Sequence, residues 1–449
     1  MIGHGAIQKK VAIIGGGLAG CEIANILSSV GIGCSIFEMK PKRFSPAHTS
    51  AHLAELVCSN SLRSKDPASA VGLLKEEMRE LGSIVMESAQ QSEVPAGRSL
   101  AVDRERFSAY ITRKLEDSPQ IKIERREIRS LSDPVLTSFS HVVIAAGPLI
   151  SEPLARDLLS KVGQRELYFY DAIAPIISGD SINWERVFWG SRYEEGSGDY
   201  VNCPMTQQEY KRFWEELIKA KKVVPREFEK EIHFEGCLPI ETMAERGEMT
   251  LAFGPLKPVG LIDPRTGKMP YAVVQLRPEN KEKTMFNMVG FQTKLTYPEQ
   301  KRVFRMIPGL ERARFERLGS IHRNTYVNAP KVLGPFLEIK RLPGVFLAGQ
   351  ITGVEGYVES AACGLFVGIY LAHYLFNKNI PLPPRECALG ALLGHLREEK
   401  VSFQPMNINF GLMPPIKGRM KKAKRRERYV ERARRYFREW REALSIFKG

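Results

Sequence analysis

A glycine-rich turn near the N-terminus constrains the fold of this chain more than any other feature. Residues 11–14 are apolar and mostly β-branched, as in a buried parallel strand, and residues 21–30 have the apolar period of a helix. A strand-like run at 34–38 ends in Glu38, 18 residues after Gly20. Between the first strand and the helix lie six residues that fit Gly-x-Gly-x-x-Gly, namely Gly15, Gly16, Gly17, Leu18, Ala19 and Gly20. The spacing predicts a helix N-terminus that holds a pyrophosphate and a Glu38 carboxylate that accepts hydrogen bonds from a ribose.

Two later segments indicate that the nucleotide is FAD. The apolar runs at 141–147 and 344–349 each end in glycine. Flavoproteins of the glutathione-reductase type return to their nucleotide domain with such strands, the last of which passes the flavin ribityl phosphate. Gly349 and Gln350 are therefore expected to bind FAD, with an amide at 350 where Asp is usual. Because no second Gly-x-Gly-x-x-Gly occurs between residues 40 and 449, a disulfide reductase with a separate nicotinamide domain is disfavoured.

These segments predict an α/β fold with a discontinuous nucleotide domain. We expect a doubly wound, Rossmann-like FAD-binding domain of glutathione-reductase type, built from residues 1–180 and 325–449. Residues 181–324 would form an inserted α+β domain, and the active site would lie in the cleft between the two.

Basic charge is concentrated at the C-terminal end of the chain. Residues 417–449 contain 14 Lys and Arg against 4 Asp and Glu, which is +10 of the total formal charge of +15. Apolar side chains recur there at helical spacing: Tyr429, Ala433, Tyr436 or Phe437, Trp440 and Leu444. The pattern predicts a helix that docks one face on the body and presents Arg and Lys outward. A solvated charged face is the alternative, but the charge density favours RNA or DNA as a partner.

Composition bounds the class of protein. The seven cysteines include no Cys-x-x-Cys pair, so neither a disulfide framework nor a metal site is indicated. The longest nearly uncharged stretch, 363–376, is too short to cross a bilayer and is expected to be a buried helix. The first ten residues have no apolar leader, and we expect a cytoplasmic protein.

Three polar stretches carry a more specific signal. They read Ala-Glu-Leu-Val-Cys-Ser-Asn-Ser-Leu-Arg-Ser at 54–64, Phe-Glu-Gly-Cys-Leu-Pro-Ile-Glu at 234–241 and Gly-Gln-Ile-Thr-Gly-Val-Glu-Gly-Tyr-Val-Glu-Ser-Ala at 349–361. At these residues the sequence resembles the folate- and FAD-dependent tRNA uracil-5-methyltransferases, a bacterial family. The likeness runs from residue 11 to about 412 and includes 46–49, 94–97, 101–104, 202–206, 253–261, 271–277, 322–325 and 403–411.

The resemblance implies a reaction and its participants. These are 5,10-methylenetetrahydrofolate as carbon donor, reduced FAD as carrier and reductant, NADH or NADPH to reduce the flavin, and 5-methyluridine in the tRNA T-loop as product. Uracil C5 becomes nucleophilic only after a thiolate adds at C6, and a base must later remove the C5 proton. The family motifs place these groups at Cys237, assigned as nucleophile, and Cys58, assigned as base or flavin-side partner, although the two roles can be exchanged. Tyr357 is placed to stack on the flavin, the pterin or the target base.

Other candidate residues have a plainer interpretation. We expect Cys21, Cys34, Cys363 and Cys387 to be small buried hydrophobes, and His48 and His322 to be structural. For Cys203, structural and functional roles are equally favoured. Arg63 is a candidate cation for a thiolate at Cys58. Residues 390–402 depart from the family pattern, which puts folate or RNA contacts there in doubt.

Three alternatives remain at this point. The same chemistry can act on a uridine of ribosomal RNA. A larger tRNA wobble-uridine flavoprotein shares the FAD domain, but has a long C-terminal extension that this chain is not expected to carry. A non-catalytic RNA-binding flavoprotein is the third.

Overall fold

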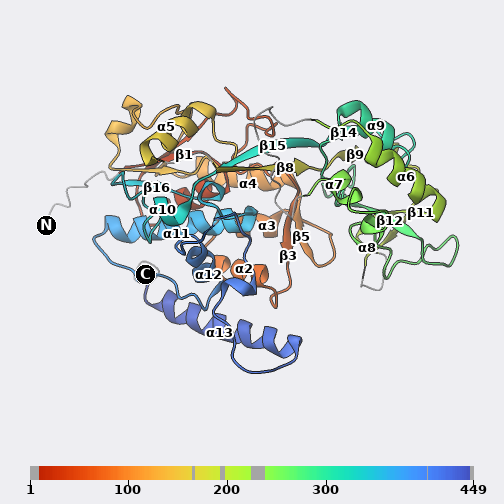
Figure 1. Ribbon diagram of the computed structural model, residues 1–449. Coiled ribbons are helices and arrows are strands. Elements are labelled where there is room, and N and C mark those ends of the chain that lie inside the picture. Colours follow the sequence, from red (N-terminus) through yellow and green to blue (C-terminus); the bar gives the residue numbers. More distant parts are fainter. Residues whose placement is uncertain (1–9, 164–166, 193–197, 224–237, 402, 445–449) are drawn as a thin grey trace.

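The computed structural model describes residues 10–163, 167–192, 198–223, 238–401 and 403–444 (Figure 1). Two sheets with separate apolar cores dominate this part of the chain. The body also contains the helices α2 (Ala70–Glu80), α3 (Ile84–Gln91), α4 (Arg104–Glu116), α5 (Glu152–Val162), α10 (Ala329–Val332) and α12 (Ala388–His395).

The first sheet is parallel and carries the glycine-rich turn. Its strands are ordered β16-β7-β1-β2-β6, with bounds Val345–Leu347, His141–Ile144, Val11–Ile14, Cys34–Glu38 and Ile121–Arg125. Every neighbouring pair is parallel. The late strand β16 lies beside β7 although about 200 residues separate them, as the sequence predicts for an FAD domain.

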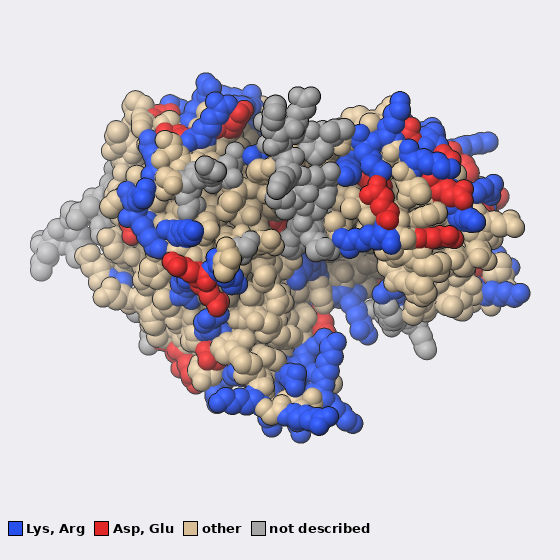
Figure 2. Space-filling model, viewed as in Figure 1, with Lys and Arg blue, Asp and Glu red and all other residues tan. Residues whose placement is uncertain are grey.

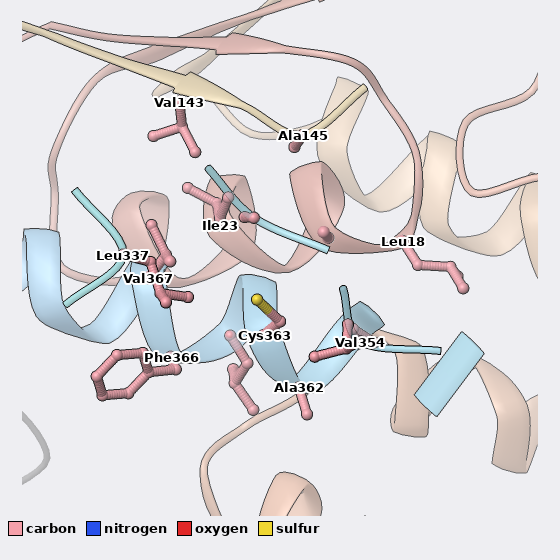
Figure 3. Close-up of a cluster of buried hydrophobic side chains, with 14 of the residues drawn as sticks. Leu18, Ile23, Val143, Ala145, Leu337, Val354, Ala362, Cys363, Phe366 and Val367 are labelled. Carbon is pink, nitrogen blue, oxygen red and sulfur yellow. The ribbon is translucent and has the colours of Figure 1, made fainter. Parts of the chain in front are cut away.

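Helices α1 (Leu18–Ser29) and α11 (Tyr357–Leu375) pack closely beneath this sheet (Figures 1 and 3). Glycine permits the approach, since a Cβ on Gly364 would lie 2.3 Å from the carbonyl oxygen of Ala19. α11 is long and apolar enough to span a membrane, yet 83% of its most apolar window is buried inside the protein. The predicted buried helix at 363–376 is therefore confirmed as part of α11.

The second sheet is antiparallel and lies to the right in Figure 1. Its order is β10-β11-β12-β13-β9-β14, with bounds Phe188–Gly190, Tyr200–Met205, Ala272–Pro278, Met285–Met288, Ile176–Ser178 and Phe315–Arg317. Four helices accompany these strands: α6 (Gln207–Lys219), α7 (Ile240–Ala244), α8 (Thr250–Phe253) and α9 (Tyr297–Phe304).

A two-stranded ladder runs between the two sheets. β8 (Leu167–Ile173) pairs with β15 (Ser320–Tyr326) over seven residues. A small sheet of β3 (Ser61–Ser64), β5 (Ser99–Val102) and β4 (Glu93–Val94) lies beside the ladder (Figure 1). The antiparallel sheet already includes β9, before residue 181, and the domain limits at 180/181 and 324/325 stay a prediction.

The basic C-terminal segment forms helix α13 (Lys422–Glu442). Its buried residues are Tyr429, Val430, Ala433, Phe437 and Trp440. All but Val430 lie on the stripe that the sequence predicts, and the helix docks against α2.

Candidate functional site

A cavity follows the glycine-rich turn across the carboxyl end of the parallel sheet. It contains about 1040 Å³ of empty space, part of it open to solvent. Its walls include all the residues predicted to bind FAD except Gly20, together with Tyr357. The residues that line the wall from the end of β7 are 145–151.

Glycines line this cavity where a side chain would fill it or where two backbone segments lie in contact. Gly15 has φ +107°, and a Cβ there would lie 2.6 Å from the carbonyl oxygen of Ala145. A Cβ on Gly20 would lie 2.0 Å from the carbonyl oxygen of Gly15, so Gly20 allows α1 to meet the turn without itself lining the cavity. Gly349 has φ +82° and lies against Ala19. Larger residues at these positions would push the helix N-terminus away from a pyrophosphate.

Glu38 is buried in the wall at the end of β2. Its Oε2 accepts a 2.9 Å hydrogen bond from the backbone N–H of Gly16, and its Oε1 accepts one of 2.9 Å from the N–H of Lys40. A carboxylate offers about four lone-pair sites, so two backbone donors leave capacity for a ribose diol. Glu38 is thus both a brace for the turn and a suitable ribose ligand.

Gln350 has a partner within the protein. Its Nε2 donates a 2.6 Å hydrogen bond to Oε2 of Glu355, a buried carboxyl whose pKa is raised well above its ordinary value by burial. The amide is therefore oriented by Glu355, on the loop that leads into α11.

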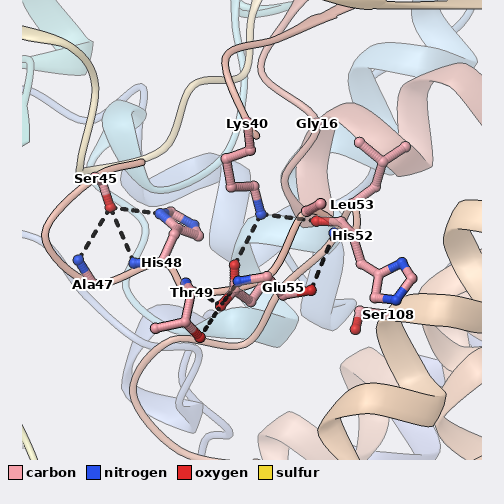
Figure 4. Close-up of polar contacts among 12 residues, drawn as sticks. Gly16, Lys40, Ser45, Ala47, His48, Thr49, His52, Leu53, Glu55 and Ser108 are labelled. Atoms are coloured by element: carbon pink, nitrogen blue, oxygen red, sulfur yellow. Dashed lines mark hydrogen bonds and ion pairs between the residues drawn. The ribbon is translucent and has the colours of Figure 1, made fainter. Parts of the chain in front are cut away.

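A buried ion pair shapes the far wall of the cavity (Figure 4). Nζ of Lys40 lies 3.0 Å from Oε2 of Glu55 and donates to the carbonyl oxygen of His52. Oε1 of Glu55 accepts from the backbone N–H groups of Thr49 and Ser50. These bonds fold the 45–55 loop into a fixed wall.

Cys58 lies beside the cavity under Tyr357. The backbone N–H groups of Cys58 and Ser59 donate to Oη of Tyr357 at 2.6 and 3.2 Å. The Cys58 thiol is partly buried, with Sγ 3.9 Å from the carbonyl oxygen of Ala172 on β8. Because Tyr357 also lines the cavity, its hydroxyl joins the cysteine loop to the nucleotide site.

The end of strand β12 clamps the cysteine loop from the other side. Arg277 donates from Nε to Oδ1 of Asn60 at 2.8 Å and from a terminal nitrogen to Oγ of Ser59 at 3.0 Å. Arg104 donates to both carboxylate oxygens of Glu279, at 2.6 and 3.2 Å, and to the carbonyl oxygen of Leu56. The antiparallel sheet therefore fixes the loop that carries Cys58.

Burial raises the pKa of the Cys58 thiol, and the charge of Asp171 raises it further, while Arg104 opposes both. The thiol form is therefore favoured at neutral pH. The expected partner Arg63 is engaged elsewhere, since its guanidinium lies 2.5 Å from Oε1 of the buried Glu359. Arg104 and Arg317 lower the pKa of Cys58, and the assignment of Arg63 to the thiol stays a prediction that its ion pair with Glu359 does not support.

Comparison with known proteins identifies the family. The model of the family named glucose inhibited division protein A matches residues 10–379. A methylenetetrahydrofolate–tRNA-(uracil-5-)-methyltransferase TrmFO of Oleidesulfovibrio alaskensis is 62% identical, with 96% of this chain and 97% of that protein covered. A protein of the same name from Geobacter sulfurreducens is 56% identical over 94% of this chain and 96% of its own length. The chain belongs to this methyltransferase family. The resemblance drawn from the sequence motifs is confirmed.

A solved structure extends the comparison to the fold. Aquifex aeolicus GidA in its form I crystal has a TM-score of 0.67 and 18% identity, with 98% of this chain and 78% of that chain covered. At this identity the likeness concerns the fold alone. It confirms the α/β, Rossmann-type class expected from the sequence.

The family is a flavoprotein family, and the cavity fits FAD. Glycines stand where a Cβ would collide with backbone, the N-terminus of α1 faces the cavity, and Glu38 lies in its wall. Of the residues predicted from the fingerprint and from the late strand, all but Gly20 line this cavity and would be in position to hold the dinucleotide; their role in binding stays a prediction.

The remaining predicted residues divide clearly. Cys237 lies outside the described residues. Four other cysteines are buried, as expected for small hydrophobes: Cys21, Cys34, Cys363 and Cys387. Cys203, for which two roles were equally favoured, is also buried, within β11. The role of Cys58 as a catalytic group stays a prediction.

The two histidines are held neutral. Burial lowers the pKa of His48 to about 4, with Lys40 adding to the effect, and burial and Arg317 lower that of His322 to about 4. His48 shares a 2.6 Å hydrogen bond with Oγ of Ser45 and lines the cavity.

Sequence reasoning missed the polar clamp around Cys58. Arg104 and Arg277 lie inside motifs that the resemblance quoted, but nothing in their spacing shows that they meet at residues 56–60. Arg317 lies outside those motifs and reaches the site from β14, where it donates to the carbonyl oxygen of Ala47. No signal in the sequence shows that these arginines reach the cysteine loop, because their partners lie on other segments of the chain.

Within the divergent segment 390–402, the structure buries residues 390–396, whereas residues 398, 399 and 401 are exposed and residue 402 lies outside the described residues. α12 buries Leu392 and Leu393, and the ring of His395 stacks on Phe403 at 5.1 Å. These contacts give the residues on α12 a packing role.

Proposed function

We propose that this chain methylates C5 of the T-loop uridine of tRNA to give 5-methyluridine. The carbon donor is 5,10-methylenetetrahydrofolate, and NADH or NADPH supplies the reducing equivalents. The names of the relatives support the donor and the tRNA substrate. We also propose that the protein acts in the cytoplasm.

One observation carries the proposal. The hydroxyl of Tyr357 accepts from the backbone of Cys58 while the same residue lines the nucleotide cavity. The loop that carries the Cys58 thiol is thereby tied to a residue in the wall of the nucleotide cavity, which supports a catalytic role for that thiol. This juxtaposition suits an enzyme, whereas RNA binding alone needs no such arrangement.

The chemistry requires two placed groups. The thiolate of Cys237 adds to C6 of uracil, and the electron pair of the C5=C6 bond makes C5 the nucleophile that attacks the methylene carbon of the donor. Cys58 as thiolate then takes the proton from C5, and the electron pair left on the ring expels the amine nitrogen of the donor. This breaks the bond between that nitrogen and the transferred carbon and leaves a methylene group double-bonded to C5. A hydride reduces the transferred methylene to methyl, and loss of the Cys237 sulfur from C6 restores the C5=C6 bond. The net transfer is one methylene and one hydride, and the roles of the two cysteines can be exchanged.

Several residues would support these steps. FAD bound in the cavity would, once reduced, carry the one-carbon unit and supply the electrons. Tyr357 would present its ring to the flavin or the base, and its hydroxyl orients the Cys58 loop. Arg104 lowers the pKa of Cys58 and so favours the thiolate needed for proton removal.

The test begins with the visible spectrum of the purified protein. Yellow protein is then incubated with methylenetetrahydrofolate, NADPH and unmodified tRNA, and nucleosides are measured by mass spectrometry. We expect 5-methyluridine from the wild-type protein, loss of at least 100-fold in rate for Cys58→Ala, and near wild-type rate for Cys34→Ala, a buried cysteine on β2.

Parallel reactions with ribosomal RNA address the main alternative. Product in ribosomal RNA but not in tRNA would overturn the substrate assignment, and no product in either would overturn the enzymatic one. Product from Cys58→Ala at the wild-type rate would remove Cys58 from the mechanism.

A further inference from the structure

Helix α13 has two halves with different surroundings. The second half is fastened to the body, since Phe437 and Trp440 are buried and the indole N–H of Trp440 donates to the carbonyl oxygen of Pro381 at 2.8 Å. Two of its cations are neutralised by α2: Arg434 makes two 2.8 Å hydrogen bonds to Glu76, and Arg441 lies 3.1 Å from Glu80. These two arginines therefore help to hold the second half of α13 against α2.

The first half and the residues before it are different. We call residues 417–428 the basic arm. It contains eight Lys and Arg and one acid, Glu427. Every residue from 421 to 428 is exposed, and within the described parts of the chain none of the eight cations forms an ion pair. In Figure 2 Lys and Arg gather at the lower edge of the molecule, over the α13 region.

This arrangement is unfavourable for the helix by itself. The first turn of α13 has no acidic residue, and its N-cap, Lys421, makes no side-chain cap. Cations near a helix N-terminus oppose the helix dipole by about 0.3–1 kcal/mol each. Like charges four residues apart, such as Lys421 with Arg425 and Lys424 with Arg428, repel by a few tenths of a kcal/mol. A polyanion partner would relieve both penalties.

A short connection joins the arm to the candidate site. Asn407 donates to the carbonyl oxygen of Glu355, and the N–H of Ile408 donates to Oε1 of Glu359, both on the loop and first turn that carry Tyr357. Two residues later, Phe410 stacks on Tyr429 of α13 at 5.0 Å between ring centroids. The arm and the Tyr357 loop are thus held in a fixed relation.

We propose that the basic arm binds the phosphates of a double-helical stem of a structured RNA, next to the loop whose base enters the site. The inference rests on the proposed function for the identity of that base. A helix rises 1.5 Å per residue, so cations at 421, 424, 425 and 428 span about 10 Å. This length covers roughly three steps of a duplex, at about 3.4 Å of helix axis per phosphate of one strand. Lysine and arginine on an exposed helix can contact several of these phosphates irrespective of sequence.

The test is RNA binding without cofactors. The arm variant carries Lys421→Gln, Lys424→Gln, Arg425→Gln and Arg428→Gln. A matched variant neutralises four exposed cations elsewhere: Arg113→Gln, Arg129→Gln, Lys331→Gln and Lys378→Gln. Filter binding of unmodified tRNA is measured between 50 and 200 mM KCl, which are conditions chosen for steep salt dependence.

For the arm variant we expect at least a tenfold loss of affinity. The slope of log K against log salt, which is negative, should become shallower by about 2–4. The matched variant should keep the wild-type slope to within about one unit. The melting temperature of the arm variant should equal or exceed that of the wild-type protein, because substitution removes repulsion within α13.

Equal losses in the two variants would overturn the inference, as would arm-dependent binding to phosphatidylglycerol vesicles without binding to tRNA. The measurement does not depend on catalysis. Arm-dependent tRNA binding by a protein that makes no 5-methyluridine would contradict the proposed function and leave this inference standing.

Discussion

The backbone N–H of Cys58 donates a 2.6 Å hydrogen bond to the hydroxyl oxygen of Tyr357, although 299 residues separate them in the chain. Tyr357 begins α11, beside the last strand of the nucleotide sheet, whereas Cys58 lies on a loop clamped by β12 of the antiparallel sheet. This bond joins the two sheets at the candidate site.

Removal of the Tyr357 hydroxyl should loosen the cysteine loop. In Tyr357→Phe the N–H groups of Cys58 and Ser59 lose their acceptor, which costs about 1–3 kcal/mol where they stay buried. We expect a rate of 5-methyluridine formation reduced about tenfold or more, with FAD content unchanged. Tyr370→Phe, on the same helix, is the control and should keep its rate. A rate for Tyr357→Phe equal to wild type would show that the hydroxyl is dispensable.

Gly15→Ala should abolish FAD binding. The new Cβ would lie 2.6 Å from the carbonyl oxygen of Ala145, at a φ of +107° that side chains rarely adopt. Strain of about 1–3 kcal/mol adds to displacement of the turn from the pyrophosphate. Flavin absorbance of the purified variants measures the outcome. Gly33→Ala, whose Cβ would meet only ordinary contacts, should stay yellow; a yellow Gly15→Ala protein would contradict the cavity assignment.

Glu279→Ala should destabilise the protein through Arg104. Both side chains are largely buried, and removal of the carboxylate leaves a guanidinium without its partner. We expect the free energy of unfolding to fall by about 3–5 kcal/mol in urea titrations. Glu152→Ala removes one partner of the exposed ion pair with Arg156. This substitution should change the free energy of unfolding by less than about 0.5 kcal/mol. Similar effects of the two substitutions would disprove the clamp.

Stability should decline in mild acid because of the buried histidines. The pKa of His48 and that of His322 are lowered to about 4, while unfolded histidine titrates near 6.5. The unfolded chain therefore binds more protons in this interval, and stability present above pH 6.5 is lost as the pH falls towards 4. Unfolding free energies at pH 7.5, 5.5 and 4.5 measure the loss. His322→Gln should make the loss of stability between pH 7.5 and 4.5 smaller. An unchanged pH profile in that variant would refute the lowered pKa of His322 as a cause of the loss.

The local signals in the sequence were sufficient for the nucleotide fold. The strand, the glycines and Glu38 lie within 28 residues, and the structure brings them together as expected because parallel β-α-β units form from neighbouring segments. The stripe on α13 was also predictable, since helical periodicity alone defines the buried face. The motifs predicted a cysteine site, and its role stays a prediction. They did not show that Arg104 and Arg277 would contact the loop that carries Cys58.

By itself, the sequence determined that a glycine-rich turn suited to a nucleotide would lie at the end of a parallel sheet and that the C-terminal helix is basic, and it predicted that residues 54–64 and 349–361 carry chemistry. Only the tertiary structure decided which charges surround Cys58, that Arg63 pairs with Glu359, and which half of α13 keeps its cations free of ion pairs. The reason is physical: glycine turns and helical stripes follow from short-range geometry, whereas the partner of a buried charge depends on packing between segments hundreds of residues apart.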